Sequence, residues 1–307
     1  MNVSAMDFDL RVRLKAFEWL GNASNRYGET LPRRLLEIGF DFEDIRIPLV
    51  GPQGIFKPHG NDYPLSITTI PDSHYDDKLS DGDFIYYKYR GTDPQHWENV
   101  GLRRLFEKNR PLIYFYRVVI GQYVASWPAY IIADDPARLT FTVAIEETDT
   151  FYSGQSVQHS SLESSNARQA YITMQVKVRL QQQTFRERVL KAYQSKCAFC
   201  HLRHRELLDA AHIIPDSEPA GTPTIPNGLA LCKLHHAAFD RFLIGVTSDY
   251  TILVRQDILD EDDGPILQHG LQELHNTGLV LPHDRKDWPL PANLAWRFDQ
   301  FLQHANP

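Results

Sequence analysis

Cysteine is scarce in this sequence, with three residues in 307, at positions 197, 200 and 232. An odd number of cysteines cannot pair completely, and thiols in the cytosol stay reduced. The sequence also lacks the ~20 consecutive apolar residues that a membrane-spanning helix needs. Its first residues show no basic start followed by an apolar core. These absences argue against a disulfide scaffold and against a membrane partner, and we expect a cytoplasmic protein.

Positive charge is also in deficit, with 32 lysines and arginines against 39 acidic residues and a net charge of −7. Contacts with nucleic-acid phosphates depend on local charge rather than on the total. Residues 174–205 contain eight basic residues and one acid, Glu187, whereas acidic residues gather at 257–263. This distribution is typical of a DNA-binding enzyme, although a solvated helix face would show the same local pattern.

The order of the expected elements divides the chain into two domains. Apolar residues at helical spacing predict helices over 7–28 and 31–39, and short β-rich runs separated by turns fill 45–145. A basic helix over 180–194 and a closing helix over 289–303 are expected further on. The sequence therefore predicts an α+β protein with three parts: a β-barrel domain with flanking helices at 1–148, a linker at 149–173 and a second domain at 174–307.

Cysteine and histidine occur in two pairs with the spacing of metal ligands. Cys197 and Cys200 form a Cys-x-x-Cys turn, and Cys232 and His235 form a Cys-x-x-His turn. Two such turns make a closed tetrahedral zinc site, which stabilises a fold but has no open position for chemistry. We predict structural Zn²⁺ here; the alternative is that the cysteines are buried apolar thiols.

A second set of polar residues follows the order His212, Asn227, His236, on an expected strand, loop, strand and helix. With the apolar flanks and the zinc turns, residues 185–245 resemble the HNH endonucleases, whose fold is called ββα-metal. The resemblance implies metal-dependent phosphodiester hydrolysis of double-stranded DNA. The alternative is that both histidines are ordinary packed side chains or spare zinc ligands.

The resemblance also implies a role for each residue of this set. His212 would be the general base, because a neutral imidazole can accept a proton near pH 7. His236 would bind the catalytic Mg²⁺ or Mn²⁺, and Asn227 would brace the loop. Many HNH enzymes carry a further ligand directly before the general base, where this sequence has Ala211. The substitutes that we expect are Asp209, two residues earlier on the same strand face, and Asp240.

The segment 84–119 resembles the SRA branch of the PUA-like barrels, which flip a modified cytosine into a pocket. The matching positions are Tyr89, Gly91, Asp93, Asn99 and Pro111. An extruded base needs aromatic faces, and a carboxylate can accept a hydrogen bond from the cytosine amino group. The resulting candidates for base and DNA binding are Tyr87, Tyr89, Arg90, Asp93, Trp97 and Lys57. The alternative is that these aromatic residues fill a barrel core and the basic residues are solvated.

The two resemblances together predict a modification-dependent restriction endonuclease, with an SRA/PUA-like reader joined to a zinc-stabilised HNH nuclease. A homodimer would supply the two sites that a double-strand break requires. The modification could be methyl, hydroxymethyl, a glucosylated base or a backbone change. Two alternatives stay open: a nicking or repair nuclease that ignores modification, and a non-catalytic, zinc-stabilised DNA-binding protein.

Overall fold

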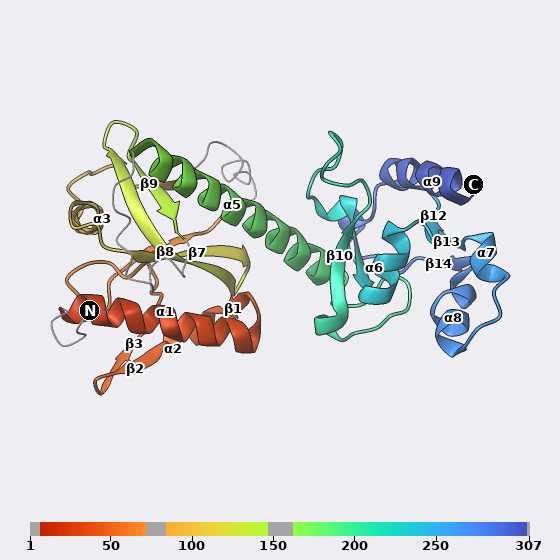
Figure 1. The fold of residues 1–307 in the computed structure, drawn as a ribbon, viewed down its shortest axis with the longest axis horizontal. Coiled ribbons are helices and arrows are strands. Elements are labelled where there is room, and N and C mark those ends of the chain that lie inside the picture. Colours follow the sequence, from red (N-terminus) through yellow and green to blue (C-terminus); the bar gives the residue numbers. More distant parts are fainter. Residues whose placement is uncertain (1–6, 72–83, 147–161, 306–307) are drawn as a thin grey trace. The chain divides into compact units, whose positions relative to one another are not determined.

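The computed structural model describes residues 7–71, 84–146 and 162–305 (Figure 1). The chain forms two compact units, Met1–Gln181 and Gln182–Pro307. Within these described ranges, no helix is both long and apolar enough to cross a membrane.

Helix α1 (Phe8–Tyr27) begins the first unit and confirms the first helix expected from the sequence. The Asp7 side chain caps it by accepting a hydrogen bond from the Leu10 amide at 2.8 Å. Its buried face carries Val12, Phe17 and Leu20, which recur at helical spacing.

A short helix, α2 (Arg33–Ile38), follows and ends at Gly39, also as expected. Gly39 has a φ of 65°, and a Cβ atom there would lie 1.9 Å from the Ile47 carbonyl oxygen. Only glycine fits, and the turn lets β2 (Phe40–Phe42) pair with β3 (Ile45–Ile47).

A seven-stranded sheet forms the centre of the first unit, in the order β4-β5-β7-β8-β9-β6, with β1 pairing to β8. Its strands are β1 (Thr30–Pro32), β4 (Ile55–Phe56), β5 (Ser66–Thr69), β6 (Ile85–Lys88), β7 (Leu112–Val119), β8 (Gln122–Asp135) and β9 (Thr140–Ile145). Among the strands of the described ranges, β5 and β7 alone pair in parallel. Register shifts at three places in β7 and β8 mark irregularities that bend these strands.

Both faces of the sheet are covered, so neighbouring residues of β7 enter two different cores. Ile113 and Phe115 pack with α1 and α2, whereas Tyr114 and Tyr116 pack with α3 (Trp97–Glu107). The barrel expected from the sequence is seen only as an open sheet, because no pairing joins the end strands β4 and β6 among the described residues.

The helix expected at 180–194 is longer than its sequence pattern suggested. Helix α5 runs from Leu162 to Ala192, so residues 162–173 of the predicted linker are helical; residues 149–161 lie outside the described ranges. Thr173, Lys177 and Leu180 are buried and lie three or four residues apart, which gives the helix a packed face in the first unit. Its last turns contribute Phe185 and Val189 to the core of the second unit.

After the end of α5, the second unit contains a hairpin of β10 (Leu208–His212) and β11 (Gly228–Cys232), followed directly by α6 (Lys233–Asp240). A three-stranded sheet of β12 (Ile244–Val246), β13 (Thr251–Val254) and β14 (Thr277–Gly278) comes next. The helices are α7 (Gln256–Leu259), α8 (Pro265–Gly270) and α9 (Pro291–Ala305). The expected hairpin after Asp240 and the expected closing helix are both confirmed.

Candidate active site and metal centre

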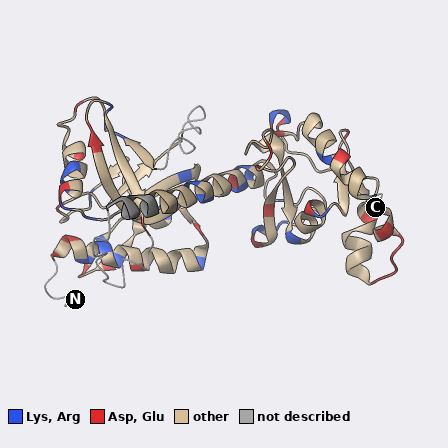
Figure 2. Ribbon diagram, turned by 45° about the horizontal axis from the view of Figure 1, so that its top comes forward, with Lys and Arg blue, Asp and Glu red and all other residues tan. Residues whose placement is uncertain are grey.

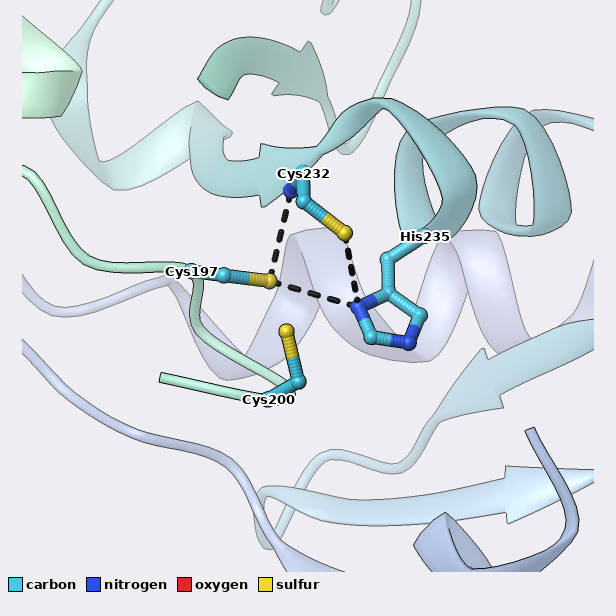
Figure 3. Close-up of side chains that lie close together, drawn as sticks. All are labelled: Cys197, Cys200, Cys232 and His235. Carbon is cyan, nitrogen blue, oxygen red and sulfur yellow. Dashed lines mark hydrogen bonds between the residues drawn. The ribbon is translucent and has the colours of Figure 1, made fainter. Parts of the chain in front are cut away.

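The three cysteines and His235 converge on one point of the second unit (Figure 3). Their sulfur and nitrogen atoms all lie within 4.8 Å of one another. His235 Nδ1 is 3.4 Å from Cys197 Sγ and 3.2 Å from Cys232 Sγ. Zinc–ligand bonds of about 2.0–2.3 Å in a tetrahedron require a nitrogen–sulfur separation of about 3.5 Å. The four donors therefore form a candidate zinc-binding group.

The charges of these four donors conflict when no cation is shared between them. Contact with Cys197 raises the pKa of the Cys200 thiol far above its ordinary value and lowers that of Cys232 far below it. Burial lowers the pKa of His235, but its contacts with Cys197 and Cys232 outweigh this and raise it to about 10. A divalent cation would stabilise the thiolates together and leave the imidazole neutral, so this donor chemistry fits zinc.

Gly270 completes the surroundings of the zinc-binding group and was not anticipated from the sequence. Its carbonyl oxygen lies 2.7 Å from His235 Nε2. Metal-bound histidines commonly donate their second ring nitrogen to a carbonyl, which fixes the tautomer and the ring orientation. Gly270 is 35 residues from His235, so no local spacing could have predicted this contact.

His212 is the last residue of β10 and pairs in register with Gly228. Its imidazole stacks on Phe185, with ring centroids 3.9 Å apart and planes 12° apart. A Cβ atom on Gly228 would lie 2.8 Å from the Phe185 ring, so glycine is needed for this stack. The ring of His212 is thus held by its packing against Phe185.

The Nε2 atom of His212 is buried and has no hydrogen-bond partner in the described part of the chain. Burial lowers the pKa of His212, the charge of Asp216 raises it, and the charge of His236 lowers it again. The net shift is downward, which favours the neutral imidazole. The residue as a whole is half-buried, and a neutral imidazole with an unpaired nitrogen has the properties of a general base.

Asn227 is fully buried and connects the two ends of the loop between β10 and β11. Its Nδ2 donates to the carbonyl oxygens of Ile214 at 2.9 Å and Thr222 at 3.0 Å. Its Oδ1 accepts from the Ile214 amide at 3.0 Å, and its own carbonyl accepts from the Ile213 amide at 2.9 Å. Asn227 therefore fixes the backbone that directly follows His212.

His236 lies on α6 between the two carboxylates singled out in the sequence. Asp209 Oδ2 is 3.7 Å from its Nδ1, and Asp240 Oδ2 is 3.3 Å from its Nε2. The contact with Asp209 raises the pKa of His236, and burial opposes this. The two carboxylates therefore face opposite nitrogens of one ring.

Asp209 is already paired with two cations, whereas Asp240 is more exposed. Asp209 Oδ2 lies 2.9 Å from Lys233 Nζ, and Asp209 Oδ1 lies 3.4 Å from Arg186 Nε. Burial alone would raise the pKa of Asp209, but His236 and Lys233 outweigh it and hold that pKa well below its usual range. The side chain of Asp240 is 55% exposed, which leaves its carboxylate accessible.

The basic run at 174–205 does not present one continuous positive face. Lys and Arg recur at intervals along α5 (Figure 2). Lys177 is buried, Arg186 donates to the Leu208 carbonyl at 2.9 Å, and Arg205 pairs with Glu187. Part of this charge therefore stabilises the fold and is not free to contact phosphate.

The residues singled out in the first unit divide between its interior and its surface. Tyr87 and Tyr89 are buried, and the Tyr89 ring stacks on Phe141 with centroids 4.6 Å apart. The other four are exposed: Lys57, Arg90, Asp93 and Trp97. Asp93 accepts a hydrogen bond from the Gln95 amide at 2.8 Å.

Glu98 is a buried carboxylate of the first unit that sequence reasoning missed. It is 1% exposed, and its two oxygens have no hydrogen-bond partner among the described residues. Two basic side chains lie close to Oε2, Arg90 with its Nε at 3.5 Å and His96 with its Nδ1 at 3.7 Å. Nothing in the sequence indicates that this carboxylate is buried, because acidic residues are common in the first turn of a helix.

Residues 197–247 match the protein family described as HNH endonuclease. No curated protein matches the sequence. A solved structure titled "Modification dependent TagI restriction endonuclease" is similar to the chain at 14% identity and a TM-score of 0.29. That similarity covers 78% of this chain and 81% of the other. The family match spans β10, β11, α6 and the zinc-binding group, and residues 197–247 are an HNH endonuclease domain, which implies a nuclease that hydrolyses DNA.

Proposed function

We propose that this nuclease is a modification-dependent restriction endonuclease that cuts double-stranded DNA near modified cytosine. The observation that carries the catalytic part is the state of His212. Its Nε2 has no hydrogen-bond partner in the described ranges, and its lowered pKa favours the neutral imidazole, which can accept a proton. Asn227 fixes the backbone beside it.

A divalent cation, Mg²⁺ or Mn²⁺, would be held by His236 Nε2 and Asp240. Imidazole nitrogen and carboxylate oxygen are ordinary ligands of such ions, and Asp240 Oδ2 lies beside Nε2. Asp209 lies beside the opposite ring nitrogen, Nδ1, and would orient the ring rather than bind the same cation. When bound, the cation neutralises the charge that builds on the phosphate and on the leaving oxygen.

The pH dependence of cleavage should report the environment of His212. Because burial lowers its pKa below the ordinary 6.5, the neutral base persists as the pH falls. The acid limb of the kcat/KM profile is therefore expected below pH 6.5. Asp216→Asn removes a charge that raises this pKa, so it should move the limb to still lower pH at an unchanged plateau. An acid limb above pH 6.5, or one that does not move in Asp216→Asn, would contradict the role of His212 as general base.

The reader part of the proposal concerns the first unit and rests on its resemblance to the SRA branch. Two carboxylates there could accept from the cytosine amino group: the exposed Asp93, and Glu98, whose oxygens have no hydrogen-bond partner among the described residues. Trp97 offers an exposed ring for stacking. Two copies of the chain would supply the two active sites of a double-strand break.

Cleavage of matched DNA substrates tests the reader directly. We expect plasmids with 5-methylcytosine, 5-hydroxymethylcytosine, glucosylated cytosine or a modified backbone to differ by at least tenfold in cleavage rate, because a pocket that fits one substituent discriminates by about that much against another of different size. Asp93→Asn and Glu98→Gln should each be compared with the wild type on the preferred DNA; the variant with the larger loss of cleavage identifies the carboxylate that accepts from the cytosine amino group. Equal cutting of modified and unmodified plasmids would leave a nicking or repair nuclease as the better description.

A further inference from the structure

Helix α9 lies outside the segment that matches the HNH family, yet it contacts the loop that follows His212. Asn293 Nδ2 donates a hydrogen bond to Asn227 Oδ1 at 3.1 Å, across 66 residues of sequence. Four residues further along α9, on the same face, Arg297 donates to the Phe239 carbonyl oxygen at 2.9 Å. The helix therefore contacts both the loop and the end of α6.

Arg297 fixes α9 against α6. It is 6% exposed, and its guanidinium lies over the rings of Phe239 and Phe242 at 4.7 and 4.2 Å. Asp240 Oδ1 is 3.9 Å from its NH2 group. These contacts place the start of α9 at a defined distance from α6, so Asn293 is presented to the loop by a packed element.

The hydrogen bond from Asn293 completes the set that an asparagine side chain can make. The amide of Asn227 has two N–H donors and two acceptor lone pairs. Ile214 and Thr222 carbonyls take both donors, the Ile214 amide occupies one lone pair, and Asn293 occupies the other. An inverted Asn227 amide would place like groups against each other at all of these positions.

We propose that Asn293 is a positioning residue of the nuclease. It holds the Asn227 amide in one orientation and, through it, the backbone of Ile214, two residues after His212. The proposal rests on the proposed function, because the position of His212 matters to catalysis only if the protein cleaves DNA. The assignment extends the active site to a helix that the family match does not include.

Two substitutions of Asn293 distinguish a positioning role from a role in packing alone. Asn293→Ala deletes the donor, and Asn293→Asp keeps the shape but sets a carboxylate oxygen against Asn227 Oδ1. An acidic residue in the first turn of a helix stabilises that helix, so a packing role predicts that Asp is tolerated better than Ala. A positioning role predicts the reverse: kcat about tenfold lower for Ala and about a hundredfold lower for Asp at unchanged KM, since small misplacements cost that much.

A double-mutant comparison tests whether Asn293 acts through Asn227. In an Asn227→Ala background its target is gone, so adding Asn293→Ala should lower kcat no further. If the two substitutions lower kcat independently, so that their fold-losses multiply in the double mutant, the proposal is overturned. It is also overturned if Asn293→Asp cleaves as fast as Asn293→Ala. Gln303→Glu adds the same charge at an exposed position of α9 and should leave kcat unchanged.

A readout that does not depend on cleavage keeps this proposal separate from the proposed function. Hydrogen exchange of the Ile214 amide should become faster in Asn293→Asp, while the melting temperature and zinc content stay at wild-type values. Unchanged Ile214 exchange in a folded Asn293→Asp protein would overturn the positioning role. A wild-type protein that cleaves no DNA, but in which Asn293→Asp accelerates this exchange, would refute the nuclease and leave the contact established.

Discussion

His212→Ala is expected to reduce DNA cleavage by about a thousandfold, the usual size of a general-base contribution. The substitution removes the nitrogen that accepts the proton of the attacking water. It leaves the proposed cation ligands His236 and Asp240 and the zinc-binding group in place. DNA affinity should therefore stay near the wild-type value, and the loss should fall on kcat.

The measurement is single-turnover cleavage in Mg²⁺ and in Mn²⁺, with DNA affinity and melting temperature determined in parallel. Because His212 stacks on Phe185, Ala leaves a gap there, and His212→Asn serves as a second variant that keeps more of the contact. His204→Ala removes an exposed imidazole of the same unit and should cleave normally. If His212→Ala cuts within tenfold of the wild type, the general base lies elsewhere; if neither protein cuts, the non-catalytic DNA-binding alternative is favoured.

Cys197→Ser is expected to release the zinc and unfold the second unit. Cys197 Sγ contacts both His235 Nδ1 and the Cys232 amide, so its loss removes a ligand and a backbone contact together. Structural zinc sites contribute roughly 10–16 kcal/mol to folding, which is comparable to the whole stability of about 5–15 kcal/mol of a domain. Loss of the site should therefore leave too little stability for the unit to stay folded.

Zinc content by mass spectrometry and limited proteolysis test this expectation. The wild type should hold about one zinc ion per chain, and Cys197→Ser far less, with cleavage sites for protease opening in residues 182–305 only. His201→Ala is the matched control, because this exposed imidazole is next to Cys200 in sequence and is not part of the zinc-binding group. A folded wild-type protein without zinc, or a Cys197→Ser protein with full zinc, would contradict the structural role.

Short-range patterns predicted the elements whose causes are local. Asp7 and Gly39 mark a helix start and a helix end because capping depends on a few neighbouring residues. The zinc turns were predictable for the same reason, since Cys-x-x-Cys and Cys-x-x-His each place two ligands on one turn. The contacts of Gly270 with His235 and of Asn293 with Asn227 join distant residues of ordinary type, and no spacing marks them.

The first unit shows where local patterns were insufficient. The sequence makes Tyr89 a candidate for base stacking, but this residue directly follows β6 and its ring stacks on Phe141 in the interior. Residues 162–173 look polar enough for a linker, yet Thr173 is buried against Ile145, whose amide donates to its hydroxyl at 2.9 Å. In both places the burial of the side chain depends on which residues the assembled sheet packs against it, and a local sequence pattern does not contain that information.

The carbonyl of Gly270 on His235 has a practical consequence for work with isolated fragments. A polypeptide trimmed to the family match, 197–247, would retain every sulfur and imidazole donor but lose the group that orients His235 and the Phe185 ring beneath His212. Grafting this nuclease onto another DNA-binding protein therefore calls for the whole second unit, which includes the last turns of α5.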